Sequence, residues 1–108
     1  MIGRMIHDKR FDTAITRDCY SACGLIWLAG KRRALAADAK LGFHMPWYPD
    51  ASGKRTVCDI CVAVVQSYET YLGLSADVLA FTNSADVYDI RRLSRADADR
   101  LGIEITPR

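Results

Sequence analysis

The sequence has no apolar run long enough to cross a membrane. Its longest run, from Cys23 to Gly30, is far short of the roughly 20 residues that a membrane-spanning helix needs. The first residues also lack the layout of a secretory signal peptide, which has a basic start and an apolar centre. We therefore expect no membrane segment in this chain.

The sequence also lacks an excess of one charge. The 15 basic and 13 acidic side chains are spread along the chain and give a formal net charge of +2. Proteins that track phosphates present a basic stripe, so the absence of one predicts no nucleic-acid partner. The chain has 108 residues, of which 50% are apolar, and this is enough for one compact domain and too little for two. We expect a single domain over residues 1–108.

Four cysteines leave three interpretations open, namely two disulfides, a zinc site or buried thiols. The residues are Cys19, Cys23, Cys58 and Cys61, and any pairing among them is compatible with the sequence. Structural zinc is disfavoured because its ligands usually project from turns, whereas these pairs fall in or beside predicted helices. Redox chemistry would need a helix amino terminus at Cys58, and burial on an apolar helix face already explains Cys61. The sequence therefore predicts no metal.

Apolar periodicity and turn signals predict an alternation of helices and short strands. Helices are expected at 2–9, 21–29, 57–72, 75–81 and 94–102. Strands are expected at 11–15, 33–36, 40–44 and 103–105. Ser75 and the pair Ser94 and Asp97 are predicted helix caps, and Gly30 is predicted to close the second helix in a left-handed conformation. That second helix is apolar on every side, which is typical of a helix buried all round.

This order of elements favours an α/β domain with a mostly parallel sheet and helices on both faces. Three or four short strands are fewer than such a sheet normally has, and no β-hairpin signal supplies more. Two prolines within 45–49 exclude a helix or a central strand there. Either the first strands of the sheet are missing, or self-association completes it.

Ser21 and His44 form the candidate catalytic pair. A serine at a strand-to-helix junction lies beside backbone N–H groups and a helix amino end, which can stabilise a developing oxyanion. Most serines before helices are simply N-caps, and that interpretation stays open. The second histidine, His7, falls in a short, exposed helix, so His44 is the choice for a general base. A strand-end histidine that bonds only to backbone is the alternative.

These residues resemble the catalytic core of ClpP-type serine peptidases. The resemblance lies in Cys19-Tyr20-Ser21-Ala22-Cys23, in the helix 25–30 that ends in Ala-Gly, in Arg33, and in the strand 41–44 followed by Met45-Pro46. It is closest to bacterial ClpP-like proteins of unassigned function that carry a Cys-x-Ser-Ala-Cys signature. The segment 93–103 is similar to the family's last helix and the residues after it. The resemblance implies a ClpP/crotonase-like fold, with a mostly parallel sheet and flanking helices.

The resemblance also implies how the site works. Ser21 would be the nucleophile, His44 the general base and the N–H of Ala22 an oxyanion donor. The third triad member would lie in the window that contains Asp86 and Asp89, although neither aligns without a shift. No metal ion or organic cofactor is implied. The implied partners are a peptide or protein substrate and further copies of the chain, because this fold commonly builds trimers or stacked rings.

The resemblance spans the later two thirds of the family's domain, so the domain is expected to be incomplete at its amino end. The family's first strand–helix unit supplies a second oxyanion donor, and losing one donor typically costs roughly 100 to 1,000-fold in rate. Relatives with the signature often look exported. An exported or cell-envelope location is therefore the expectation if an amino-terminal segment is missing.

Two other functions stay open. The chain can be a non-catalytic or truncated ClpP-fold remnant that serves as an oligomerisation or binding module. It can also be a crotonase-type acyl-CoA-binding protein, which shares the fold but uses two oxyanion N–H groups and carboxylates. The pair Ser21 and His44 counts against the second of these.

Overall fold

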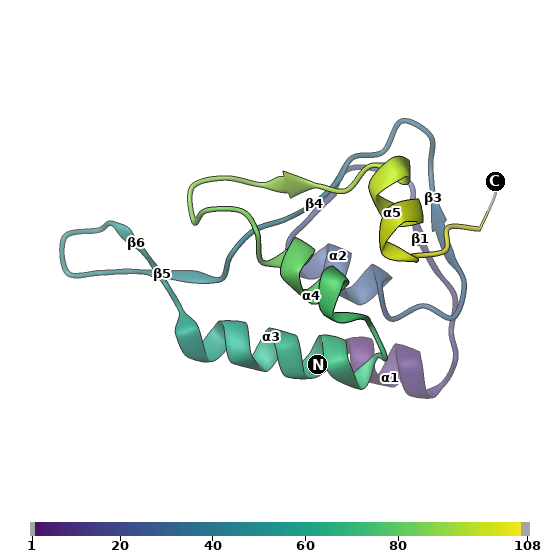
Figure 1. Ribbon diagram of the computed structural model, residues 1–108, viewed down its shortest axis with the longest axis horizontal. Helices are drawn as coiled ribbons and strands as arrows, with labels where there is room; N and C mark the ends of the chain where they lie inside the picture. The colour runs from purple at the N-terminus through teal and green to yellow at the C-terminus, as the bar shows by residue number, and fades with distance from the viewer. Residues whose placement is uncertain (1, 107–108) are drawn as a thin grey trace.

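The chain contains both helices and short strands (Figure 1), as the sequence predicts, but they do not alternate regularly. The computed structural model describes residues 2–106. The helices are α1 (Ile2–Asp8), α2 (Ala22–Trp27), α3 (Asp59–Tyr71), α4 (Ala76–Thr82) and α5 (Arg95–Leu101). The strands are β1 (Thr13–Ile15), β2 (Cys19–Tyr20), β3 (Arg33–Leu35), β4 (Leu41–Phe43), β5 (Trp47–Pro49), β6 (Arg55–Val57) and β7 (Arg91–Arg92). None of the helices within residues 2–106 is long and apolar enough to cross a membrane.

The strands form three small sheets rather than one mostly parallel sheet. β1 pairs with β3 in parallel, and β2 pairs in parallel with β4, which pairs on its other side with antiparallel β7. The expected last strand at 103–105 does not form, because only Thr106 makes an isolated bridge, to Ala34. Helices together with these small sheets confirm the mixed α/β class.

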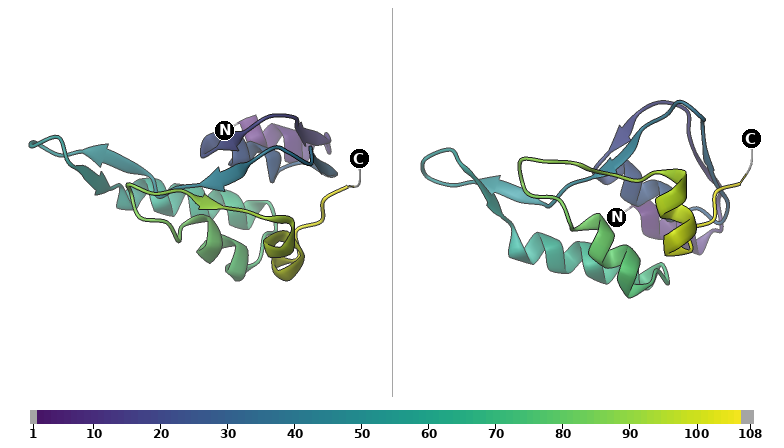
Figure 2. Two further views of the ribbon diagram at one scale, coloured as in Figure 1. Left: turned by 90° about the horizontal axis from the view of Figure 1, so that it is seen from above. Right: turned by 45° about the horizontal axis from the view of Figure 1, so that its top comes forward.

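The helices lie on both sides of β4. Figure 2 (left) shows α1 and α2 on one side of β4, with α4 and α5 on the other.

The segment between β4 and α3 forms a β-hairpin that the sequence did not predict. β5 and β6 pair antiparallel, and the hairpin extends away from the helices in Figure 1. The Asp50 carboxylate accepts hydrogen bonds from the backbone N–H groups of Ser52 and Lys54, at 2.8 and 3.0 Å, and so holds the turn. Prolines are excluded from central strands but tolerated on a two-stranded edge. Pro49 therefore fits within β5.

Local signals fix the ends of two helices as predicted. Ser75 accepts a hydrogen bond from the N–H of Val78 at 3.3 Å and caps α4. At α5, the side chains of Ser94 and Asp97 each accept from the other's backbone N–H, at 3.0 and 3.2 Å, in a capping box. Gly102 then ends α5 in the left-handed conformation, with φ of 74°.

Gly30 does not close its helix as predicted. Leu28 is the C-cap of α2, and Gly30 is not among the positive-φ residues of the described chain. It is instead required by a close approach of β1, because a Cβ at this position would lie 2.9 Å from the backbone nitrogen of Thr13. No side chain fits there without moving the strand.

The core lies around the second half of α2. Trp27 and Leu28 are each 2% exposed, and Trp27 Nε1 donates to the carbonyl of Ala34 at 2.9 Å. Ala22 and Cys23, at the other end of the helix, are exposed, so the expectation of a helix buried all round is wrong. The amino end of α2 is open to solvent, and Ser21 lies beside it.

Candidate active site

Ser21 sits in a backbone conformation that serine rarely adopts. It is the single residue between β2 and α2, with φ of 63° and ψ of −122°. Its N–H donates to the carbonyl of Gly42 at 2.9 Å, which ties the junction to β4. A strained positive φ in a non-glycine residue costs roughly 1–3 kcal/mol, and such conformations cluster at functional sites. A sharp strand-to-helix turn of this type is also what exposes the serine of a nucleophile elbow.

The hydroxyl of Ser21 does not cap its helix. No side-chain hydrogen bond from Ser21 closes the start of α2, in contrast to Ser75 and Ser94, which both accept one from their own helices. The N-cap interpretation of Ser21 therefore fails. Its Oγ is left available for another partner.

Both cysteine pairs are disulfides. Cys19 bonds to Cys23 across the Ser21 junction, and Cys58 bonds to Cys61 across the first turn of α3. The Cys58 Sγ also accepts from the N–H of Cys61 at 3.3 Å. No group of three metal-ligating side chains exists within residues 2–106, and none of the cysteines in the chain is free. Of the three interpretations, the structure supports the two disulfides.

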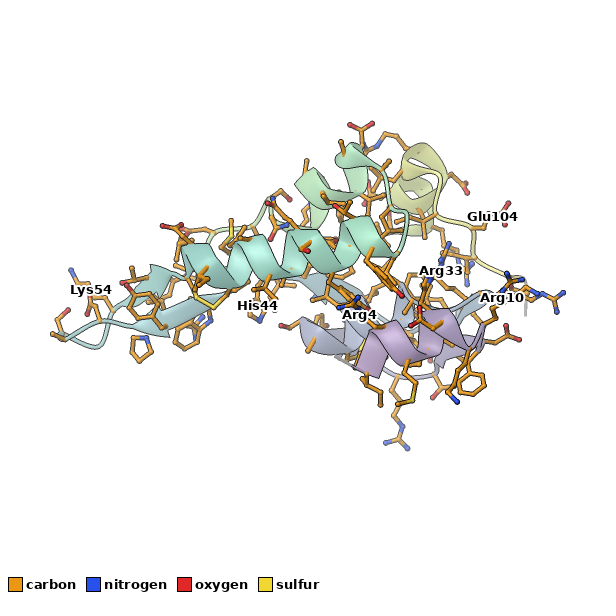
Figure 3. All side chains as sticks on the ribbon, turned by 90° about the horizontal axis from the view of Figure 1, so that it is seen from below. Arg4, Arg10, Arg33, His44, Lys54 and Glu104 are labelled. Atoms are coloured by element: carbon orange, nitrogen blue, oxygen red, sulfur yellow. A yellow bond between two sulfur atoms is a disulfide. The ribbon has the colours of Figure 1, made fainter. Side chains whose placement is uncertain are left out.

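His44 follows β4 directly and is half-buried. Figure 3 shows its side chain at the base of the β5–β6 hairpin. Its Nδ1 lies 3.0 Å from the carbonyl oxygen of Met45, so in one tautomer Nδ1–H donates to that carbonyl and Nε2 carries the free lone pair. The other histidine, His7, packs its ring edge-on against Tyr71 on a different part of the molecule.

Ser21 and His44 line the same cavity, which has a volume of about 490 Å³. Such a volume lies within the range of small-ligand sites. The wall is mostly apolar, with polar groups at separate points, and is formed by Ser21, Ala22, Leu25, Phe43, His44, Pro46, Trp47, Val65, Thr82 and Asn83. The structure therefore brings together the two residues that the sequence singled out. No direct Ser21–His44 hydrogen bond is formed within the described chain, and such bonds often tighten only when substrate binds.

The two candidate acids lie outside this cavity. Both are exposed and accept hydrogen bonds from the next residue's N–H, at 2.6 Å for Asp86 and 2.8 Å for Asp89. Neither is among the residues that line the cavity, whereas Ala22, the predicted oxyanion donor, is. The role of an aspartate in orienting His44 stays a prediction.

A buried glutamate, not singled out in the sequence, adjoins the cavity. Glu69 on α3 is 0% exposed, and its Oε2 accepts from the hydroxyl of Thr82 at 2.6 Å. Its Oε1 has no hydrogen-bond partner. Burial raises the pKa of the carboxyl from 4.5 to about 7, against the lowering effect of hydrogen bonds from Thr82 and Asn83. The sequence does contain a sign of this burial, because Glu69 lies one turn after Val65 on the apolar face of the helix.

The site combines an uncapped serine hydroxyl, an imidazole with a defined backbone partner and a cavity with apolar walls. These are the parts that acyl transfer through a covalent serine intermediate requires. No protein-family model matches this chain, and no curated protein matches it.

Proposed function

We propose that this chain is a ClpP-like serine hydrolase of the ClpP/crotonase fold, acting on a peptide or ester bond. The observation that carries the proposal is the strained, uncapped Ser21, which opens onto the same cavity as His44. Helix capping does not explain the strained conformation of Ser21, because its hydroxyl makes no capping hydrogen bond.

The proposed reaction begins with His44 in the tautomer that donates Nδ1–H to the Met45 carbonyl. Its Nε2 takes the proton of Ser21 Oγ as that oxygen bonds to the substrate carbonyl carbon. The oxygen of the tetrahedral intermediate gains the negative charge, and the N–H of Ala22 supports it. The imidazolium then protonates the leaving amine or alcohol. In the second half of the reaction, His44 takes a proton from water as the water oxygen attacks the acyl carbon, and returns it to Ser21 Oγ as the acid product leaves.

In this proposal the Met45 carbonyl does what an acid does in a triad, since it fixes the ring and its tautomer. A neutral carbonyl stabilises an imidazolium less than a carboxylate does. A modest turnover rate therefore follows, unless Asp86 or Asp89 moves toward His44 when substrate binds.

A fluorophosphonate probe, read by intact mass on folded protein, tests the proposal. We expect one adduct on the wild type and none on Ser21→Ala, because the probe reacts only with an activated serine. His44→Ala should react at least about 100-fold more slowly, since it loses the general base.

Ser75→Ala is the matched control, because it removes a capping hydroxyl and leaves Ser21 in place. Asp86→Asn and Asp89→Asn assign the acid, since a slow reaction in one of them would identify it. Folded wild type that gives no adduct would contradict the hydrolase and favour the non-catalytic binding module.

Self-association is the second part of the proposal, and the outer face of α3 supports it. Ile60 is 76% exposed and Val64 is 57% exposed, one turn apart on the same side of the helix. Exposed apolar patches of this kind often mark protein interfaces. Ile60→Asp should therefore reduce the mass measured by light scattering toward the 12.1 kDa of one chain. Gln66→Asp, on another face of α3, should leave the mass unchanged, and a wild type of one-chain mass would refute this part.

The two disulfides support an exported or cell-envelope location in this proposal. Disulfides persist in oxidising compartments and are rare where thiols are kept reduced.

A further inference from the structure

The cavity lining is polar where it meets the carboxyl end of α4, in contrast to most of its wall. Leu25, Phe43 and Val65 line it with apolar surface, whereas Thr82 and Asn83 meet it at the carboxyl end of α4. Asn83 Nδ2 donates to the carbonyl of Leu79 at 3.0 Å, which leaves its Oδ1 as an acceptor.

Glu69 lies behind Thr82, on the side away from the solvent. Thr82 lines the cavity and its hydroxyl donates to Glu69 Oε2, so one side chain separates the carboxylate from the cavity. Its other oxygen is buried without a partner, and the ion pair found within residues 2–106 joins Arg100 to Asp97 elsewhere. An ionised carboxylate with no compensating cation is among the most costly groups to bury.

We propose that the part of the cavity lined by Thr82 and Asn83 is a subsite for a basic side chain of the substrate, lysine or arginine. The apolar walls would cover the aliphatic stem, and the cation would donate to Thr82 Oγ1 and Asn83 Oδ1. Thr82 in turn donates to Glu69, so the cation meets the buried negative charge across one hydroxyl. The substrate class thus named rests on the proposed function, since Ser21 and His44 line the same cavity.

A neutral side chain of the same shape is the informative comparison. Norleucine fills the apolar walls as well as lysine does, but it leaves the carboxylate without a counter-charge. A buried polar group that one ligand satisfies and another leaves unpaired is the strongest source of discrimination that a pocket has.

The test measures binding of N-acetyl-lysine methylamide and N-acetyl-norleucine methylamide by calorimetry at about pH 8, where Glu69 is ionised. The wild type should bind the lysine ligand at least about tenfold more tightly. Glu69→Gln should remove that preference by weakening the lysine ligand alone, and Thr82→Val should reduce it. Glu104→Gln makes the same chemical change at the chain's other glutamate, which is exposed, and should keep the preference.

Equal binding of the two ligands to the wild type, or a lysine preference that survives Glu69→Gln, would overturn the subsite. The fluorophosphonate reaction separates this result from the fate of the hydrolase. An adduct on Ser21 without a lysine preference refutes the subsite alone, whereas a preference without an adduct refutes the hydrolase and keeps the subsite.

Discussion

Replacing Glu69 by glutamine is expected to stabilise the protein increasingly as the pH rises. The folded state raises the pKa of this carboxyl from 4.5 to about 7, so folding favours its protonated form. Below pH 4.5 the group is protonated in both states and has no cost. Between 4.5 and 7 the unfolded chain ionises first, and stability falls. Above 7 the full cost, roughly 3 kcal/mol, is present.

The measurement is urea unfolding of wild type and Glu69→Gln at about pH 5 and about pH 8. The advantage of the variant in unfolding free energy should grow by about 2 kcal/mol between these values. Any constant difference, such as a weaker hydrogen bond from Thr82, cancels in this comparison. Glu104→Gln should show no such growth, and a pH-independent difference for Glu69→Gln would show that the buried carboxyl ionises normally.

This prediction and the proposed subsite bear on each other. If Glu69→Gln stabilises the fold, then the natural glutamate lowers the free energy of unfolding. Residues that destabilise a fold in this way are concentrated at binding and catalytic sites. Glu69→Gln should therefore give a more stable protein with poorer recognition of a cation. The paired outcome is specific, because a merely structural glutamate would stabilise the fold or be neutral without changing ligand preference.

The parts of the fold that were predicted are those set by local chemistry. The caps at Ser75 and Ser94 depend on residues within one turn, so their side chains identify the helix starts directly. The β5–β6 hairpin was missed because two prolines argue against a strand in a sheet interior, and nothing local signals a free-standing edge pair. The prediction of a last strand was wrong because apolar and polar residues alternate over 103–105 as they do in a strand, but no other strand pairs with this segment over its length.

The candidate site was predictable in its residues but not in its conformation. Strand-turn-helix order placed Ser21 at a junction, yet serine itself gives no sign of a positive φ. Its N–H bonds to Gly42, a partner that no local pattern specifies. Glu69 was missed because its burial is created by the packing of α3 on α4, two helices whose contact no local pattern specifies. Asp86 and Asp89 were named from the resemblance, which gives only a window of the chain, and a position in the chain does not determine where a loop carboxylate points.

Trp27→Ala is expected to destabilise the protein by about 3–5 kcal/mol, since it deletes a large buried side chain and leaves a cavity. Trp27 is 2% exposed, and its loss also leaves the Ala34 carbonyl without the indole N–H. Natural domains have a total stability of about 5–15 kcal/mol, so a large share of it would be removed. Far-UV circular dichroism during urea unfolding measures the change.

Trp47→Ala is the matched control, because it removes the same side chain from the hairpin, where Trp47 is 37% exposed. It should cost clearly less than Trp27→Ala, because more than a third of the Trp47 side chain is already exposed in the folded protein. The contrast has a consequence for the site. Trp27 ends the helix that Ser21 precedes, and Gly24, in the first turn of the same helix, lies close against Phe43 and Leu41 of β4. Trp27→Ala should therefore lose the Ser21 adduct in proportion to the unfolded fraction, and an equal cost for the two variants would place the core elsewhere.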